Sequence, residues 1–224
     1  MNQTKNGLWN SPLLRSQVTS EDVRPPEMLF GYLIGPFGAL LASGIFTSQL
    51  QNYLTNVLKL DLGFLTTLQL LSTILIVAAN LVVGQLIERT RTLAGKARPW
   101  ILLSALTLSV ASVLMFIVPF ADRPARMVWI AIAYNAYYAV GFPIYNTANS
   151  TLVPVSTRNS KQRSTLASLT NIASLGVMGV GSMIFPTLVS MALKEDQHLW
   201  FVAMLAVAIF SAITIYLQFL FTRE

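Results

Sequence analysis

Apolar residues occur in six long blocks separated by short polar stretches, and this pattern sets the predicted architecture. The blocks cover residues 28–58, 62–87, 100–120, 127–150, 164–193 and 200–221. A helix of about 20 apolar residues, rising about 1.5 Å per residue, crosses a hydrocarbon core about 30 Å thick. The blocks are about twice as long as the strands of an outer-membrane barrel and do not alternate in polarity. The pattern therefore predicts an all-α membrane protein in which residues 28–224 form a bundle of six transmembrane helices.

Residues 1–27 are polar, unlike the blocks that follow. They contain Ser, Asn, Pro and mixed charges, and they lack the basic-then-apolar pattern of a cleavable signal peptide. We expect a polar cytoplasmic tail followed by an uncleaved first helix.

Basic residues gather on one side of the predicted topology. With six spans, both ends of the chain lie on the same side as the loops after the second and fourth blocks. That side carries 11 basic residues: Lys5, Arg15, Arg24, Arg89, Arg91, Lys96, Arg98, Arg158, Lys161, Arg163 and Arg223. The other side carries 4: Lys59, Arg123, Arg126 and Lys194. The positive-inside rule therefore predicts both termini in the cytoplasm and a multi-pass protein of the cell membrane.

The composition excludes several classes of function. The chain is 54% hydrophobic and only 11% charged, against roughly 25% charged residues in a soluble domain. Its net charge of +6 comes from residues between the apolar blocks, without a basic stripe carrying interleaved aromatics, so nucleic acid is not an expected partner. All nine acids lie in the tail, the loops or the helix ends, and the one histidine is His198. A membrane enzyme would need such groups clustered, so no enzyme is expected.

The loop between the second and third blocks carries the most specific motif. Residues 84–91 read GQLIERTR, and residues 95–100 read GKARPW. This loop resembles that of the major facilitator superfamily and, more narrowly, the D-R-T-R…G-K-x-R-P-W loop of the glycoside–pentoside–hexuronide:cation symporters, the melibiose-permease-like family. Residues 35–38 (GPFG) and 52–58 (NYLTNVL) resemble further family patterns, and the likeness covers residues 28–224. It implies the N-terminal six-helix half of a major facilitator fold and transport of a sugar or glycoside.

The charged positions that the resemblance associates with coupling carry other residues here. The two acids of the family's second-helix pattern fall on Ile76 and Asn80, and its sugar-contacting arginine falls on Thr170. Buried ionisable residues in membranes are costly and usually functional, and the spans of this chain contain no carboxylate away from their ends. No cofactor is expected, and the residues of this half do not support Na⁺ or H⁺ as a coupling ion.

Uncharged polar side chains within the spans are the candidate contacts for a solute. Gln69, Thr73 and Asn80 are spaced so that they share one face of a helix. A second set is predicted near one face of the fourth helix: Tyr134, Tyr138, Tyr145 and Asn149. Thr170 joins them through the family resemblance. Such groups bind sugars by hydrogen bonds and aromatic stacking; the alternative is that they form interhelical hydrogen bonds, each worth about 0.6 kcal/mol.

The motif loop is a candidate gate, consisting of Gly84, Glu88, Arg89, Arg91, Gly95, Lys96 and Arg98. An acid beside basic residues at a helix end can form contacts in one conformation and lose them in the other, as alternating access requires. The alternative is that the basic residues only fix the topology.

These features predict half of a secondary transporter, surrounded by lipid, that moves a small polar solute by alternating access. A major facilitator carrier holds its substrate between two six-helix halves, so we expect a second half from the same gene product or another copy. The competing hypothesis is a truncated or decayed carrier that serves as a non-transporting scaffold or sensor.

Overall fold

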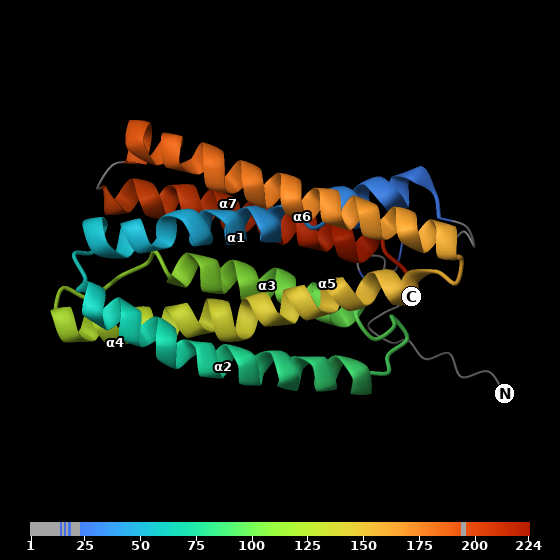
Figure 1. The fold of residues 1–224 in the computed structure, drawn as a ribbon, viewed down its shortest axis with the longest axis horizontal. Helices are drawn as coiled ribbons and strands as arrows, with labels where there is room; N and C mark the ends of the chain where they lie inside the picture. Colours follow the sequence, from blue (N-terminus) through green and yellow to red (C-terminus); the bar gives the residue numbers. More distant parts are fainter. Residues whose placement is uncertain (1–13, 15, 17, 19–22, 194–195) are drawn as a thin grey trace.

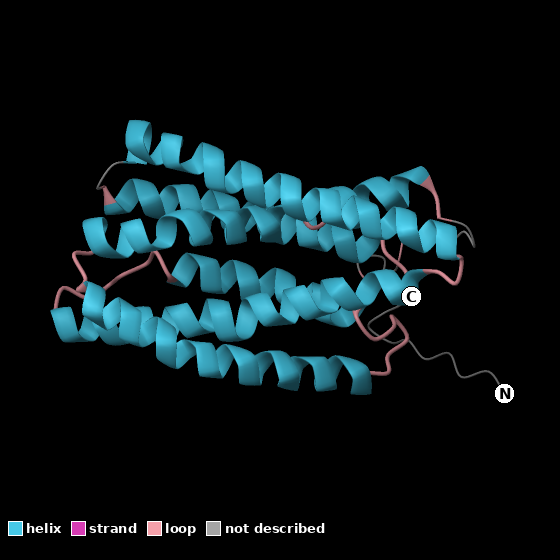
Figure 2. Cartoon of the chain, in the orientation of Figure 1, coloured by secondary structure: helices cyan, strands magenta, loops and turns pink. Residues whose placement is uncertain are grey.

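The computed structural model describes residues 14, 16, 18, 23–193 and 196–224, and this part of the chain forms a bundle of long helices (Figures 1 and 2). Most of the predicted polar tail, and Lys194 among the predicted loop charges, lie outside the described residues. Six helical segments make up the described bundle. They are η2–α1–η3 (Glu27–Ile34, Phe37–Asn52, Tyr53–Val57), α2 (Leu62–Arg89), α3 (Arg98–Leu114), α4–η4–α5 (Arg123–Asn135, Ala136–Gly141, Phe142–Ser156), α6–η5 (Ser160–Leu188, Val189–Leu193) and α7 (Gln197–Leu220).

Five of the six described segments are long and apolar enough to cross a membrane, and α3 is the exception. It has 17 residues and ends at Leu114, whereas the third apolar block runs to residue 120. Pro119 disfavours helical geometry at the residue before it, so the helix does not readily extend to the end of the apolar block. Trp129 closes the exposed end, because its Nε1 donates to the carbonyls of Leu114 and Ile117 at 3.2 and 2.5 Å.

Capping side chains place three helix starts. Asp61 accepts hydrogen bonds from the amides of Gly63 and Phe64, at 3.0 and 3.3 Å. Asn159 and Asp196 cap α6 and α7 in the same way. Capped first turns are polar, which explains why α6 and α7 begin at Ser160 and Gln197, before the apolar blocks at residues 164 and 200.

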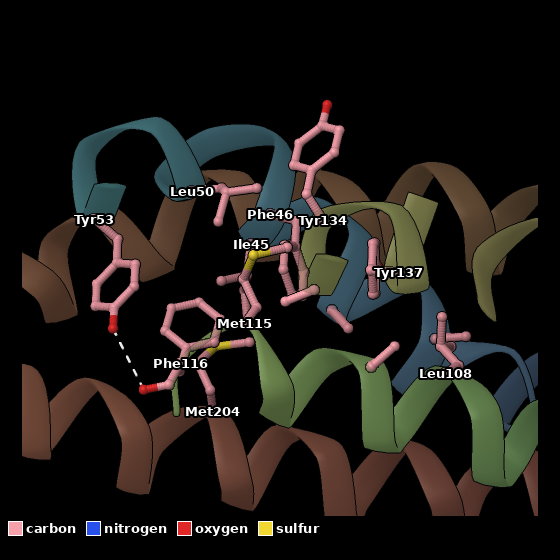
Figure 3. Packing of buried hydrophobic residues seen from close by; sticks show 14 of the residues in the cluster. Ile45, Phe46, Leu50, Tyr53, Leu108, Met115, Phe116, Tyr134, Tyr137 and Met204 are labelled. Carbon is pink, nitrogen blue, oxygen red and sulfur yellow. Dashed lines mark hydrogen bonds between the residues drawn. The ribbon is translucent and has the colours of Figure 1, made fainter. Parts of the chain in front are cut away.

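Aromatic side chains fill the centre of the bundle (Figure 3). Phe46 stacks on Tyr137 with ring centroids 4.0 Å apart, and Tyr53 lies against Phe116 at 4.5 Å. The Tyr53 hydroxyl donates to the Phe116 carbonyl at 3.4 Å, so this buried phenol is satisfied. Trp200 from α7 closes the cluster beside Phe116.

Glycine allows the first segment to approach α7 closely. A Cβ added to Gly38 would lie 2.3 Å from the Cα of Ser211 in α7. The Gly38 amide also donates to the Thr214 hydroxyl at 3.1 Å. Small residues permit this kind of backbone contact between membrane helices, and here they fix α1 against α7.

Candidate functional site

The ends of several helices form one polar end of the bundle, at the right of Figure 1. We call it the basic end and define it by the segment ends Glu27, Arg89, Arg98, Ser156, Ser160 and Leu220. The predicted gating residues lie here.

Three neighbouring helices, α2, α5 and α6, carry exposed uncharged polar side chains. Helix α2 contacts α5, and α5 contacts α6, so the three lie side by side (Figure 1). We use the name open face for six of these exposed polar side chains: Gln69, Thr73, Asn80, Asn146, Ser150 and Asn171. All six lie within segments that are long and apolar enough to span a membrane.

The three asparagines of the open face lie at similar depth. Asn80 is nine residues before Arg89, Asn146 is ten residues before Ser156, and Asn171 is eleven residues after Ser160. At about 1.5 Å per residue, each lies roughly 14 to 17 Å from the end of its helix. The three asparagines therefore lie at similar distances from the basic end.

The predicted residues of α2 are exposed and make hydrogen bonds only within their own helix. Thr73 donates from Oγ1 to the Gln69 carbonyl at 2.8 Å, and Asn80 donates from Nδ2 to the Ile76 carbonyl at 2.8 Å. In the part of the chain that the structure describes, no side chain of the open face bonds to another helix. The side-chain oxygen of Asn80 is thus left for an external partner.

The structure divides the predicted residues of the fourth segment into two environments. Tyr134 and Tyr138 pack against each other with ring centroids 4.5 Å apart; Tyr138 is half-buried, whereas Tyr134 is 8% exposed and belongs to the core cluster drawn in Figure 3. Tyr145 and Asn149 are buried. The π-helical turn η4 contains Tyr138 and shifts the register between Tyr134 and Tyr145, because a π turn holds more residues than an α turn.

Tyr145 and Asn149 belong to a buried hydrogen-bond network with α7. The Tyr145 hydroxyl donates to Oε1 of Gln218 at 3.3 Å, and Nε2 of Gln218 donates to Oδ1 of Asn149 at 2.7 Å. This is the interhelical role that such residues fill as an alternative to binding solute. Thr170 is half-buried and bonds to the Leu166 carbonyl in its own helix at 3.0 Å.

The predicted gating residues have different surroundings. Glu88, Arg89 and Arg91 are exposed, and the described residues contain no ion pair among these three. Lys96 is also exposed, and a Cβ added at Gly84 would meet open space. Arg98 is buried, with only 5% of its surface exposed. The loop thus combines exposed charges with one buried arginine.

Several residues outside the predicted site contribute to these arrangements. Asn146 and Asn171 belong to the open face, and their polarity within apolar segments was the available signal. Gln218 holds Tyr145 and Asn149, while Glu27 and Glu224 bond at the basic end. Only their tertiary neighbours distinguish these last three from ordinary polar residues near helix ends.

The family model described as "MFS/sugar transport protein" matches residues 31–224. The chain belongs to this family of major facilitator sugar transporters. It is 26% identical to the isoprimeverose transporter of Lactiplantibacillus pentosus over 216 residues, which cover 93% of this chain and 44% of that protein. It is also 26% identical to the inner membrane symporter YicJ of Escherichia coli over 161 residues, covering 70% of this chain and 35% of that protein.

Membership of the MFS sugar transport family confirms the resemblance to glycoside–pentoside–hexuronide:cation symporters. It also makes the chain a multi-pass membrane protein of a transporter family, with no enzyme indicated. The chain spans less than half the length of these curated relatives.

Proposed function

We propose that this chain is one six-helix half of a secondary transporter that moves a sugar, glycoside or similar small polar solute by alternating access. The basic end faces the cytoplasm in this proposal, in agreement with the positive-inside rule. The observation that carries the proposal is the open face, where asparagine side chains from three adjacent helices are exposed at similar depth.

The open face is unsuited to lipid. Polar groups in contact with hydrocarbon are costly, so polar side chains within membrane spans normally face protein or a water-filled cavity. The exposed amides and hydroxyls of the open face carry no charge, and they match the hydroxyls of a neutral sugar. The half-exposed ring of Tyr138 adds an aromatic surface on which a sugar can stack. These features favour a polyhydroxylated, uncharged solute.

A second six-helix half completes the cavity in this proposal. Much of the apolar surface of α2 and α6 is exposed, including Leu70, Ile74, Leu81, Leu175 and Met183. In the major facilitator fold the substrate lies between two such halves. The second half belongs to the same gene product or to another copy of it. We assign no Na⁺ or H⁺ site to this half, because its spans contain no carboxylate away from their ends.

Uptake by the native protein in its own membranes tests the proposal, with the variants introduced at the gene so that any longer product or partner is retained. Asn80→Ala and Tyr138→Ala should each raise the KM for a radiolabelled glycoside by about tenfold, the loss expected for one or two hydrogen bonds or a stacking contact. Leu71→Ala, at an exposed apolar position of the same α2 helix, is the matched control and should leave uptake unchanged. Normal KM in both test variants, with normal protein abundance, would remove the solute site from this face.

The second candidate is a carrier that no longer transports and acts as a scaffold or sensor. Two observations favour it. Ile76 and Asn80 occupy positions where the resembled family has acids. Tyr145 and Asn149 are already hydrogen-bonded to Gln218. Deletion of the gene distinguishes the two candidates. A scaffold predicts unchanged uptake of every glycoside tested, whereas a carrier predicts loss of uptake for its own solute.

A further inference from the structure

The C-terminal segment of residues 219–224 contacts several distant parts of the chain, and we call it the clasp segment. Arg98 reaches it from the start of α3. Its Nη2 and Nε donate to the Phe219 carbonyl at 2.9 and 3.3 Å, and its guanidinium lies 4.7 Å from the centre of the Phe219 ring. The last carbonyls of a helix lack intrahelical donors, and a cation is favoured there. Arg98 therefore closes the end of α7.

Glu224 makes the reciprocal contact, because its side chain caps the start of α3. Oε1 of Glu224 accepts from the amides of Ala97 and Arg98 at 2.6 and 2.7 Å, and Oε2 accepts from the amide of Lys96. Helix α3 has no cap from its own sequence, since Ala97 stands at the capping position and lacks a side-chain acceptor. A carboxylate from a residue more than 120 positions away supplies it, and the helix dipole favours a negative charge at this end.

Gly95 is required beside this carboxylate for two reasons. Its φ of +103° lies in the region that side-chain-bearing residues rarely adopt. A Cβ at this position would also lie 2.2 Å from Oε2 of Glu224. The motif glycine therefore both shapes the turn and makes room for the cap.

The clasp segment is also tied to the first and fourth segments. Arg223 forms an ion pair with Glu27 at 2.9 Å between Nε and Oε1, and the Glu27 side chain is buried. Ser156, at the end of α5, donates to the Arg223 carbonyl at 3.2 Å and also bonds to the Tyr32 hydroxyl. The start of α3, the start of the first segment and the end of α5 thus all contact residues 219–224.

We propose that Glu224 is a positioning residue that holds the loop of residues 90–98 on the end of α7. With the carboxylate in place, the loop and α7 move as one rigid body. The exposed charges of Arg89, Arg91 and Lys96 are then presented at a fixed place on this half. A gate at this end works through those charges against a partner surface, and the loop itself does not refold. This inference goes beyond the proposed function, because the contact needs no solute.

The chain contains no cysteine, so single introduced thiols report on the loop without further changes. Ala94 is 7% exposed, and in membrane vesicles Ala94→Cys should react slowly with a membrane-permeant maleimide. Adding Glu224→Ala should raise its labelling rate about tenfold, because local opening exposes the loop. Gly95→Ala should also raise the labelling rate. The double change should raise it little further, because both substitutions remove the same contact between Glu224 and the loop.

Two controls make the labelling interpretable. Leu93 is 74% exposed in the native chain. Leu93→Cys should therefore label rapidly in every variant, which shows that each variant is inserted and accessible to the maleimide. Glu88→Ala removes an exposed acid next to the same loop and should leave the Ala94→Cys rate unchanged. If Glu224→Ala prevents accumulation in the membrane, Glu224→Gln and Glu224→Asp replace it. Gln keeps one acceptor oxygen, and Asp keeps the carboxylate on a shorter side chain. Both should therefore give Ala94→Cys labelling rates between those of the native chain and Glu224→Ala.

Equal Ala94→Cys labelling rates in the native, Glu224→Ala and Gly95→Ala backgrounds would overturn the inference. Uptake gives a second measurement, and this arm rests on the proposed function. Glu224→Ala should lower the maximal uptake rate and leave the KM within about twofold, unlike Asn80→Ala, which should change the KM. A labelling change with no KM effect of either Asn80→Ala or Tyr138→Ala would retain the clasp and remove the solute site.

Discussion

At the basic end, polar side chains link one helical segment to another, whereas on the open face they bond only within their own helix. Arg98, Glu224 and Ser156 each join elements far apart in the sequence. Asn80 and Thr73 bond to carbonyls one turn earlier in α2. Arg98, Glu224 and Ser156 of the basic end are thus bonded inside this chain, while the polar groups of the open face retain capacity for a partner.

The apolar residues of the helices differ in the same way. The most apolar stretch of Glu27–Val57 is 67% buried within this chain, and that of α2 is only 17% buried. The first segment is held by α6 and α7, while α2 contacts mainly α5 and η4. Burial within the chain identifies the part of the bundle that is complete. Under the proposed function, the exposed helices are the part that contacts lipid or a second half.

Glycine substitutions should give the largest contrast between packed and exposed surfaces. Gly38→Leu should cost about 3 kcal/mol or more, because its side chain would meet the backbone of Ser211. Gly176→Leu on α6 is the matched control, since an added Cβ there meets nothing within 4 Å, and its effect should stay within about 1 kcal/mol. Titration with a denaturing detergent in mixed micelles measures both. Equal effects would mean that α1 and α7 do not pack as described.

Removing the buried arginine should have the next largest effect. Arg98→Met leaves the Phe219 carbonyl without its charged donor and should lower the free energy of unfolding by about 2 to 3 kcal/mol. Arg91→Met removes an exposed basic residue of the same loop and should change it by no more than about 0.5 kcal/mol. If the two variants unfold alike in the same titration, Arg98 does not support the basic end.

The smallest expected effect concerns the buried network beside the open face. Gln218→Leu leaves Tyr145 and Asn149 without their partner and should cost about 1 to 2 kcal/mol. The exposed Gln69→Leu should leave stability nearly unchanged. Uptake by the two variants then separates the roles of the residues. A KM effect of Gln218→Leu beyond that of Gln69→Leu would indicate that the network also shapes the solute site.

The sequence predicted much of the architecture because a membrane-spanning helix requires a continuous run of about 20 apolar residues. Apolar blocks located the helical segments, and the motif of residues 95–100 indicated the family that the comparison with known proteins confirmed. Differences arose where local chemistry competes with hydropathy. Helix α3 ends at Leu114, ahead of Pro119, and the capping residues Asn159 and Asp196 begin helices within polar sequence.

The candidate site was less predictable from the sequence. The helix face on which a side chain lies depends on the register of the helix, and its hydrogen-bond partner depends on residues far away in the sequence. Helical spacing identified the exposed stripe of Gln69, Thr73 and Asn80, which lies in regular α-helix. The same reasoning put Tyr138 and Tyr145 near one face, but η4 changes the register between them.

By itself, the sequence determined that this protein is helical, lies in a membrane and belongs to a family of sugar transporters. The tertiary structure decided which polar residues are already bonded and which stay exposed. Glu224 caps α3, and Gln218 holds Asn149, across separations of 126 and 69 residues. Hydropathy and helical periodicity describe neighbours within one or two turns. A hydrogen bond between helices depends on how those helices pack, so it appears only once the bundle is formed.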